Sequence, residues 1–462
     1  MSGPTRLATP GAVLTGSAGR ELWAWCFLAI VALAVAGVFA VLLAVSRLPG
    51  IEEVFPWPLE FFAKGLVIHV VYSFIVWFLA VFGALLHLAT QRVAGDKPRA
   101  NGLGIAGVAS VAVASILLLI PALLDRGEPS LNNYLPVIVD PLYYVGLVLL
   151  AGGVALAAVR LAVNLPGRQT VDPVAFGVAC AAGAYGIALI CVALAFWLLS
   201  GVAPTHDYNE DLFWGAGHVL QFVNTALMLG AWHLLGVNVL GRPPMASGWY
   251  KGLALWLLAF TLPAPALYLF QIPFSAAQTI TFTLLQYAMA PPVLAAAGLT
   301  ALAFAGRNAA PLPWRHLGFL CLVLSAGVFA VGGVLGLFVD GTDTRTPAHY
   351  HGVIAGVNLS FMGLFYVVFL PLLGRAPPWG RMLYSQIALF AGGQTVAALG
   401  LFLAGGYGAP RKTAGAEQGL EGIGAIAGMA MNGIGALVAV AGGVLFIWTV
   451  ARALVSRPPG TY

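Results

Sequence analysis

The sequence predicts an all-α polytopic membrane protein with about 12 transmembrane helices. Of its 462 residues, 60% are hydrophobic and only 8% are charged, whereas globular proteins carry about 25% charged residues. The mean hydropathy is +0.93. So few charges cannot cover the surface of a water-soluble particle of this size, and most of the chain must therefore face lipid.

The same composition excludes two other classes of protein. The net charge of +5 belongs to a membrane protein with basic loops, so it does not indicate nucleic-acid binding. The four cysteines lie in apolar runs without pairing motifs, which excludes a disulfide scaffold: Cys26, Cys180, Cys191 and Cys321. The partners that we expect from composition are membrane lipids.

Twelve apolar stretches are long enough to span a bilayer, which requires roughly 20 residues. Each must be helical, because lipid offers no partners for backbone N–H and C=O groups. We expect them to form a single integral membrane domain over residues 1–462. The predicted spans are Leu22–Ser46, Phe62–Leu88, Ile105–Leu124, Pro141–Val159, Val174–Leu199, Phe213–Leu235, Leu253–Phe270, Ile280–Phe304, Leu317–Val339, Ala348–Leu373, Met382–Leu403 and Ile426–Val450.

The loops predict an orientation. With twelve spans both termini lie on one side, and that side carries 15 of the 21 basic residues, while 13 of the 16 acidic residues lie on the other. By the positive-inside rule the short tails, residues 1–21 and 452–462, are cytoplasmic. We expect a location in a bacterial-type inner membrane. No carboxylate is predicted to be deeply buried, and a proton pump of the usual design is therefore not expected.

Four of the eight histidines have a simple interpretation. His206 and His316 lie in a loop or at a helix start, where solvated side chains are expected. His87 and His233 lie near the cytoplasmic ends of their spans, where we expect the rings to extend to the interface.

The other four histidines share one depth in the outer half of the membrane. His69 lies about two turns into its span, His218 is in the outer turns of span six, and His349 and His351 open span ten. Residues two positions apart on a helix are rotated by about 200° around its axis, so the rings of His349 and His351 point to opposite faces. That spacing suits two separate ligands, such as two haems, better than one chelated metal.

At these residues the chain resembles subunit I of the haem-copper oxidase superfamily, which includes nitric oxide reductases. Ala63–His69 is similar to the helix that supplies a low-spin haem ligand, and Pro347–Gly352 contains the family's His-x-His pair. Phe213–His218 is similar to a segment ending in Gly-His, and Gly408–Lys412 resembles a Gly-x-Pro-Arg-Arg stretch. The resemblance covers all twelve spans.

The resemblance implies a set of cofactor ligands. His349 would bind a high-spin haem, and His351 and His69 would bind a low-spin haem from opposite sides. His218 would ligate the non-haem metal, which makes His218 and His349 the implied catalytic residues. The haems are expected to be b-type.

Basic residues after span eleven are the implied partners of the haem propionates. Arg411 and Lys412 are among only six basic residues on the outer side, and Arg pairs with carboxylates in a bidentate manner. Their alternative role is to solvate a loop. Arg345 is a weaker candidate for the same propionate contact.

The chain departs from the family pattern at the non-haem metal. Span seven contains none of the family's adjacent histidines, and neither does span eight. Tyr268, Gln221 and Gln278 are weak oxygen donors, and a metal held by one imidazole lacks the fixed set of ligands that it needs. A non-haem copper or iron is therefore doubtful. Phe222 occupies the place of a tyrosine found in one class of oxygen reductases.

Two functions follow. The first is a di-haem subunit that receives electrons at the low-spin haem and reduces a small gas at the high-spin haem, with nitric oxide favoured over oxygen. The second is a non-catalytic electron conduit that has lost the second metal and links a partner subunit to the quinone pool. In either case electrons come from a cytochrome c-like or other electron-donating subunit, or from quinol, because the chain has no Cys-x-x-Cys-His motif. A transporter would not explain the His-x-His pair.

Overall fold

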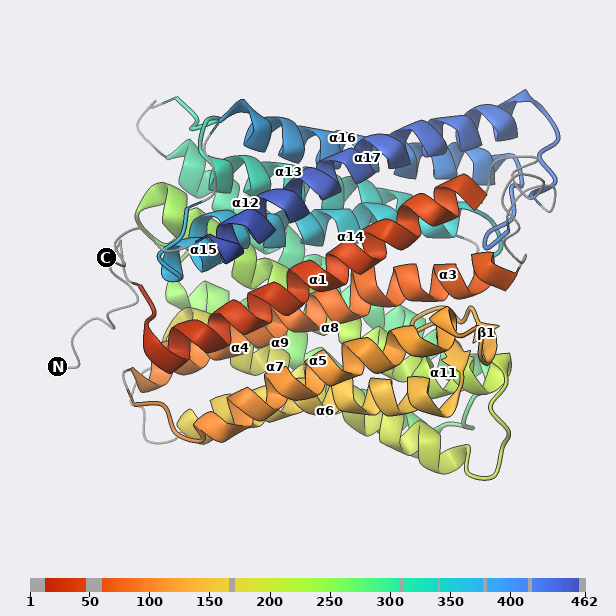
Figure 1. The fold of residues 1–462 in the computed structure, drawn as a ribbon, viewed down its shortest axis with the longest axis horizontal. Coiled ribbons are helices and arrows are strands. Elements are labelled where there is room, and N and C mark those ends of the chain that lie inside the picture. Colours follow the sequence, from red (N-terminus) through yellow and green to blue (C-terminus); the bar gives the residue numbers. More distant parts are fainter. Residues whose placement is uncertain are drawn as a thin grey trace.

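The computed structural model describes residues 13–46, 60–95, 97–165, 171–306, 311–339, 341–376, 380–413 and 418–456. Twelve helices or helix pairs in this part of the chain are long and apolar enough to cross a membrane. They lie side by side in one bundle, with the first residues of α1 and the last residues of α17 at the same end of it (Figure 1). The predicted tails, residues 1–21 and 452–462, lie partly outside the described residues.

The elements follow one another along the chain in this order. They are α1 (Gly16–Ser46), α3 (Glu60–Val70), the π-helix η2 (Val71–Val76), α4 (Trp77–Ala94), α5 (Asn101–Leu123), β1 (Glu128–Ser130), β2 (Val137–Val139), α6 (Pro141–Asn164), α7 (Pro173–Leu198), α8 (His206–Leu240), α9 (Ser247–Thr261), α10 (Ala264–Phe270), α11 (Ala276–Leu285), the 3₁₀-helix η3 (Gln286–Met289), α12 (Ala290–Ala305), α13 (Leu317–Leu335), the 3₁₀-helix η4 (Gly336–Phe338), α14 (Arg345–Leu364), the π-helix η5 (Phe365–Phe369), α15 (Leu370–Leu372), α16 (Arg381–Gly406) and α17 (Ile423–Val455).

The twelve predicted spans are confirmed, but several helices, most of all α1, α8 and α9, begin earlier than hydropathy indicates. Helix α8 begins at His206 because the side chain of Thr205 accepts a hydrogen bond from the Tyr208 N–H at 3.2 Å, which caps the first turn. Helix α1 begins at Gly16 and includes the charged residues Arg20 and Glu21, which precede the apolar run that starts at Leu22. Hydropathy detects the apolar part of a helix and misses a polar first turn.

Three spans form the centre of the bundle. The buried share of the most apolar window is 78% in Phe62–Ala94, 78% in His206–Leu240 and 72% in Arg345–Leu372, against 50% or less in the other nine. A helix buried on all sides cannot be an ordinary lipid-facing helix. These three central spans carry His69, His218 and the pair in span ten.

A short β-hairpin closes one end of the bundle. Strands β1 and β2 pair antiparallel, with Glu128 opposite Val139 and Ser130 opposite Val137. The hairpin lies at the end opposite the start of α1 and the end of α17 (Figure 1). We name that end of the bundle the hairpin end, and the other the terminal end. The loop of this hairpin carries Tyr134, and the sequence does not indicate the hairpin.

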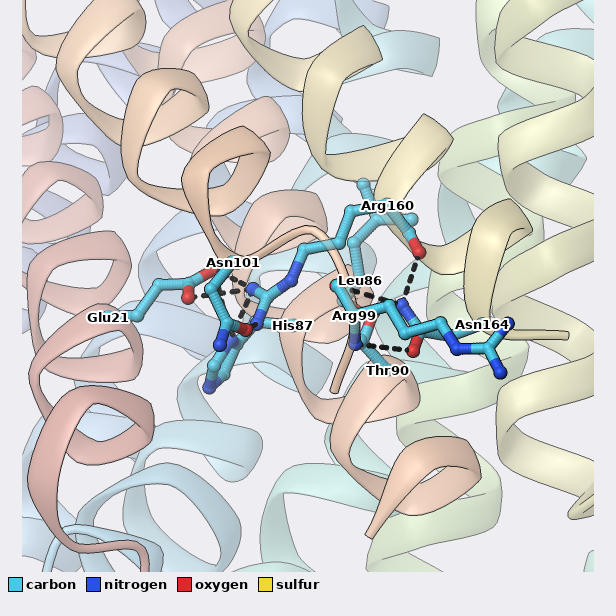
Figure 2. A network of polar contacts seen from close by, with 8 residues as sticks. All are labelled: Glu21, Leu86, His87, Thr90, Arg99, Asn101, Arg160 and Asn164. Carbon is cyan, nitrogen blue, oxygen red and sulfur yellow. Dashed lines mark hydrogen bonds and ion pairs between the residues drawn. The ribbon is translucent and has the colours of Figure 1, made fainter. Parts of the chain in front are cut away.

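A buried ion-pair network at the terminal end contradicts two predictions. Glu21 is only 9% exposed and His87 only 2%, so a carboxylate is buried after all and the ring of His87 does not reach the interface. Arg160 Nη1 donates to both Glu21 oxygens at 2.5 and 2.7 Å, and His87 Nδ1 lies 3.0 Å from Glu21 Oε1. Figure 2 shows Asn101 completing the network, since its Oδ1 accepts from Arg160 Nη2 at 2.7 Å.

His233 also differs from its predicted place at the interface. Its ring is buried and lies 4.4 Å from the Tyr250 ring. Single-sequence reasoning puts a histidine near a helix end at the surface, but both His87 and His233 belong to the most buried spans. Burial of those helices decides the position of their side chains.

Candidate functional site

His69 is oriented by helix α1. Its Nδ1 lies 3.0 Å from the carbonyl oxygen of Ala36. A carbonyl only accepts hydrogen bonds, so Nδ1 carries the proton and the ring's lone pair is on Nε2. Metal-ligating histidines have this arrangement, in which the second nitrogen fixes the ring and the tautomer.

His349 is oriented in the same way by helix α13. Its Nδ1 lies 2.8 Å from the Gly332 carbonyl oxygen. The two helices touch backbone to backbone at this level, because a Cβ at Gly352 would lie 2.4 Å from Gly332 Cα. Glycine at both positions brings the carbonyl within reach of the ring. The lone pair of His349 is again on Nε2.

His351 lies at a depth that matches His69. Trp77 lies eight positions after His69, and Asn358 lies seven positions after His351. The indole Nε1–H of Trp77 donates to Asn358 Oδ1 at 2.7 Å. Both spans run in the same direction, so along the helices the contact lies at most about 12 Å from His69 and about 10 Å from His351. The two histidines therefore lie at the same level on neighbouring central helices.

The π-helix η2 lies between His69 and Trp77. A π-helical turn holds more residues than an α-helical turn, so it changes which of the residues that follow His69 along the chain face α14. The Trp77 ring stacks on Phe365 of η5 at a centroid distance of 5.5 Å. The span that carries His69 and the span that carries His351 thus each contain a π-helical segment that follows the histidine along the chain. Such segments are frequent at functional sites.

The fourth histidine, His218, has both ring nitrogens engaged. Its Nδ1 lies 2.7 Å from the Trp214 carbonyl oxygen, so Nδ1 carries the proton. Its Nε2 lies 2.9 Å from the Tyr134 hydroxyl and 3.4 Å from Thr283 Oγ1. His218 is 1% exposed.

The donor set fits haem better than it fits a second metal. His69 and His349 each present an oriented imidazole with its lone pair on Nε2, which is what an axial haem ligand needs. Around His218 the neighbours are neutral hydroxyl, amide and aromatic groups. Across the described ranges, no three His, Cys, Asp or Glu side chains gather to hold a metal ion. The residues present do not fit a non-haem metal site.

The three weak oxygen donors considered from the sequence do not complete such a site. Gln278 is buried, but its Oε1 accepts from the Phe274 N–H at 2.8 Å and its Nε2 donates to the Leu267 carbonyl at 3.0 Å. Gln221 donates to the Gly217 carbonyl at 3.4 Å. Tyr268 packs against Phe282, and its hydroxyl lies beside Gly215 of α8.

The basic loop lies beside the start of α14. A β-bridge joins Asp343 to Pro410, and the Thr344 N–H donates to the Ala409 carbonyl at 3.0 Å. This places Arg411 and Lys412 next to the first turn of the helix that carries His349. Arg345 has Asp343 as an ion-pair partner, with Nη2 to Oδ2 at 2.7 Å.

The ammonium of Lys412 contacts the hairpin loop. Its Nζ donates to the Leu131 carbonyl and lies 3.4 Å from Asn133 Oδ1. Burial, and secondarily the positive charge of Arg411, lower the pKa of Lys412 to about 8. Arg411 therefore remains the stronger candidate for a propionate, while Lys412 connects the basic loop to the loop that carries Tyr134.

We expect Lys412 to make stability rise with pH between about 8 and its ordinary pKa of 10.5. In this window the unfolded chain binds a proton that the folded chain has released, so raising the pH favours the folded chain. Below pH 8 both forms are protonated and the contribution is constant. Thermal unfolding of the wild type and Lys412→Met in detergent tests this. The difference in Tm between them should increase from pH 8 to 10.5. A difference in Tm that stays constant up to about pH 10.5 and falls above it would show that the folded-state pKa is raised, as expected if the ammonium pairs with an anion.

Sequence reasoning missed Tyr134, Thr283 and Gln286. Gln286 Nε2 donates to the Tyr134 hydroxyl at 3.2 Å, and Tyr134 reaches His218 from 84 residues away. The chain contains a weak local signal for this contact, because Gly217 precedes His218 and a Cβ there would lie 2.3 Å from the Tyr134 ring.

Comparisons with known proteins identify the family of the chain. The family model described as "Cytochrome C and Quinol oxidase polypeptide I" matches residues 21–452. An uncharacterised protein of Aquifex aeolicus (strain VF5) is 26% identical and covers 74% of this chain and 83% of its own length. Another uncharacterised protein, from Rickettsia prowazekii (strain Madrid E), is 22% identical and covers 93% of this chain and 95% of its own length.

A solved structure has the same fold. A haem-copper terminal oxidase dimer determined by cryo-electron microscopy matches with a TM-score of 0.78 at 16% identity, covering 96% of this chain and 85% of that chain. The match with the family model over most of the length, and the twelve-helix fold, support the same conclusion. The chain therefore belongs to the haem-copper oxidase subunit I family and is a membrane-bound redox subunit that binds haems.

Proposed function

We propose that the chain takes up electrons at a low-spin haem held by His69 and His351, and passes them to a high-spin haem held by His349, where a small gas is reduced. The observation that carries this proposal is the placement of the histidines. His69 and His351 lie at one level on two central spans that the Trp77–Asn358 hydrogen bond joins. His349 faces the neighbouring helix α13 through its bond to Gly332.

The chain's own residues orient the imidazole rings of the histidines and exclude water from their surroundings. The carbonyls of Ala36 and Gly332 fix the tautomers of His69 and His349. Buried Phe361 and Phe365 surround Trp77 below the ligands and exclude water there. Haem, when bound to these residues, would supply an iron that exchanges single electrons and can bind a diatomic gas.

Nitric oxide is the favoured gas. Two molecules of nitric oxide need two electrons and two protons to give nitrous oxide and water, and two haems can store two electrons. One molecule of oxygen needs four electrons, which in this family requires further redox groups. Here Phe222 cannot donate an electron and a proton as a tyrosine can, and the surroundings of His218 do not fit a metal.

The second candidate is an electron conduit without gas chemistry. The hydrogen bond from the Tyr134 hydroxyl to His218 Nε2 favours it, because the imidazole that would hold a reactive metal is already engaged. In this role the chain would link an electron-donating subunit, such as a cytochrome c-like protein, to the quinone pool. In the first role such a subunit, or quinol, would supply the electrons.

The proposal includes an orientation and a location. The terminal end of the bundle would face the cytoplasm and the hairpin end, with the haem ligands, the outer side of a bacterial-type inner membrane. The distribution of basic and acidic residues supports this.

Spectroscopy of the purified protein distinguishes the candidates. We expect two b-type haems per chain by pyridine haemochrome assay, one low-spin and one high-spin. Carbon monoxide and nitric oxide should bind the reduced high-spin haem, and nitrous oxide should form when reductant and nitric oxide are supplied. Two haems without any gas binding would refute the reductase and support the conduit. A protein without haem would refute both.

A further inference from the structure

The hairpin loop occupies the space beside His218. The Tyr134 ring lies 4.4 Å from the His218 ring and 5.5 Å from the Trp214 ring. A side chain at Gly217 would collide with it, since an added Cβ would lie 2.3 Å from the Tyr134 ring. The tyrosine thus packs directly on the turn of α8 that carries the histidine.

The hydrogen bonds of this cluster have one direction. The Trp214 carbonyl only accepts, so His218 Nδ1 carries a proton. The side chain is 1% exposed, and burial favours the neutral imidazole, so Nε2 carries no proton and accepts. The Tyr134 hydroxyl, 2.9 Å away, is therefore the donor to Nε2. Gln286 Nε2 in turn donates to the Tyr134 oxygen at 3.2 Å. Each group is neutral, and the lone pair that a metal would need is engaged.

Several contacts hold the loop in this place. The Asn133 N–H donates to Glu210 Oε2 at 2.8 Å, and the Leu135 N–H donates to Asn132 Oδ1 at 2.9 Å. Lys412 donates to the Leu131 carbonyl. The loop is attached to α8 on one side and to the basic loop on the other, so Tyr134 reaches His218 from a fixed position.

We propose that the Tyr134 hydroxyl occupies the Nε2 lone pair with which His218 would coordinate a metal. A neutral, hydrogen-bonded Tyr134–His218 pair then lies where a non-haem metal would otherwise be bound. This inference deepens the proposed function and rests on it for the neighbouring haem. It assigns His218 as a hydrogen-bond acceptor. It also assigns Tyr134, from a loop outside the spans, as the residue whose hydroxyl and ring occupy the space beside His218.

The first test is the metal content of the holoprotein. By elemental analysis, the iron in the wild type should equal its haem content, with no stoichiometric copper. After dialysis against zinc sulfate and then buffer, no zinc should remain bound. One non-haem metal per chain in the wild type that is lost in His218→Ala would overturn the proposal.

The second test builds the missing ligands. Tyr134 and Thr283 both have oxygens within 3.4 Å of His218 Nε2. Imidazoles at these two positions would therefore meet that of His218 in the three-nitrogen set that zinc prefers. The variant Tyr134→His/Thr283→His should retain one zinc per chain, and adding His218→Ala should abolish it.

The outcomes separate this inference from the proposed function. Failure of the double variant to retain zinc, with a wild-type circular dichroism spectrum, would show that these side chains do not converge on His218, and would overturn the inference. Zinc retention is measured whether or not haem is present. A protein without haem would refute the proposed function, while the zinc result would still decide the ligand geometry.

Discussion

Replacing His351 by alanine should remove one of two haems per chain, and the haem that is lost should be the low-spin one. His69→Ala should have the same effect, because a bis-histidine site needs both imidazoles. The Trp77–Asn358 hydrogen bond places the two histidines at one level, so both variants address one cofactor. The measurement is the haem content with optical and electron paramagnetic resonance spectra of the oxidised protein.

His349→Ala should give the complementary result. The low-spin signal should remain and the high-spin signal, with its carbon monoxide difference spectrum, should disappear. His349 and His351 are two positions apart, so a general defect in α14 would remove both signals from both variants. The separation of the signals is therefore the informative result.

A histidine outside the site serves as the control. His316 caps α13, with its Nδ1 accepting from the Gly318 N–H at 3.1 Å. His316→Ala should cost about 1 kcal/mol as a lost helix cap and leave both haem signals unchanged. If His349→Ala and His351→Ala both kept two haems, the assignment of ligands would be wrong.

The fold was largely predictable because a bilayer restricts the possible structures. Hydropathy located all twelve spans, and the errors lay at polar helix starts such as His206 in α8. The shared depth of His69, His349 and His351 was also predictable, since it depends only on counting residues along helices. Which carbonyl holds each ring, Ala36 or Gly332, depends on how helices pack, and a single sequence contains no record of that packing.

Contacts between distant segments were not predictable. Tyr134 comes from a loop, and its hydroxyl meets His218 only after the hairpin folds onto α8. The loop residues have no hydrophobic period, and Gly217 alone does not identify what fills the space beside it. The same limit applies to Glu21, which lies in the predicted N-terminal tail, residues 1–21, and which the structure buries beside Arg160.

Replacing Arg160 by methionine should destabilise the protein by about 3–5 kcal/mol, the cost of leaving a buried carboxylate without its partner. Arg160 is 2% exposed and donates to both oxygens of Glu21 and to Asn101. These residues come from α1, α5 and α6, and His87 adds α4 (Figure 2). The network therefore ties four spans together at the terminal end.

A second substitution separates this pairing from simple packing. The double variant Glu21→Leu/Arg160→Met removes both charges and should recover most of the lost stability, because apolar residues replace a buried ion pair at little net cost. Arg242→Met, at an exposed position, should change stability by no more than about 0.5 kcal/mol. Unfolding in mixed detergent measures all three. If the double variant were less stable than Arg160→Met, the network would stabilise the bundle by packing, and not because it neutralises a buried charge.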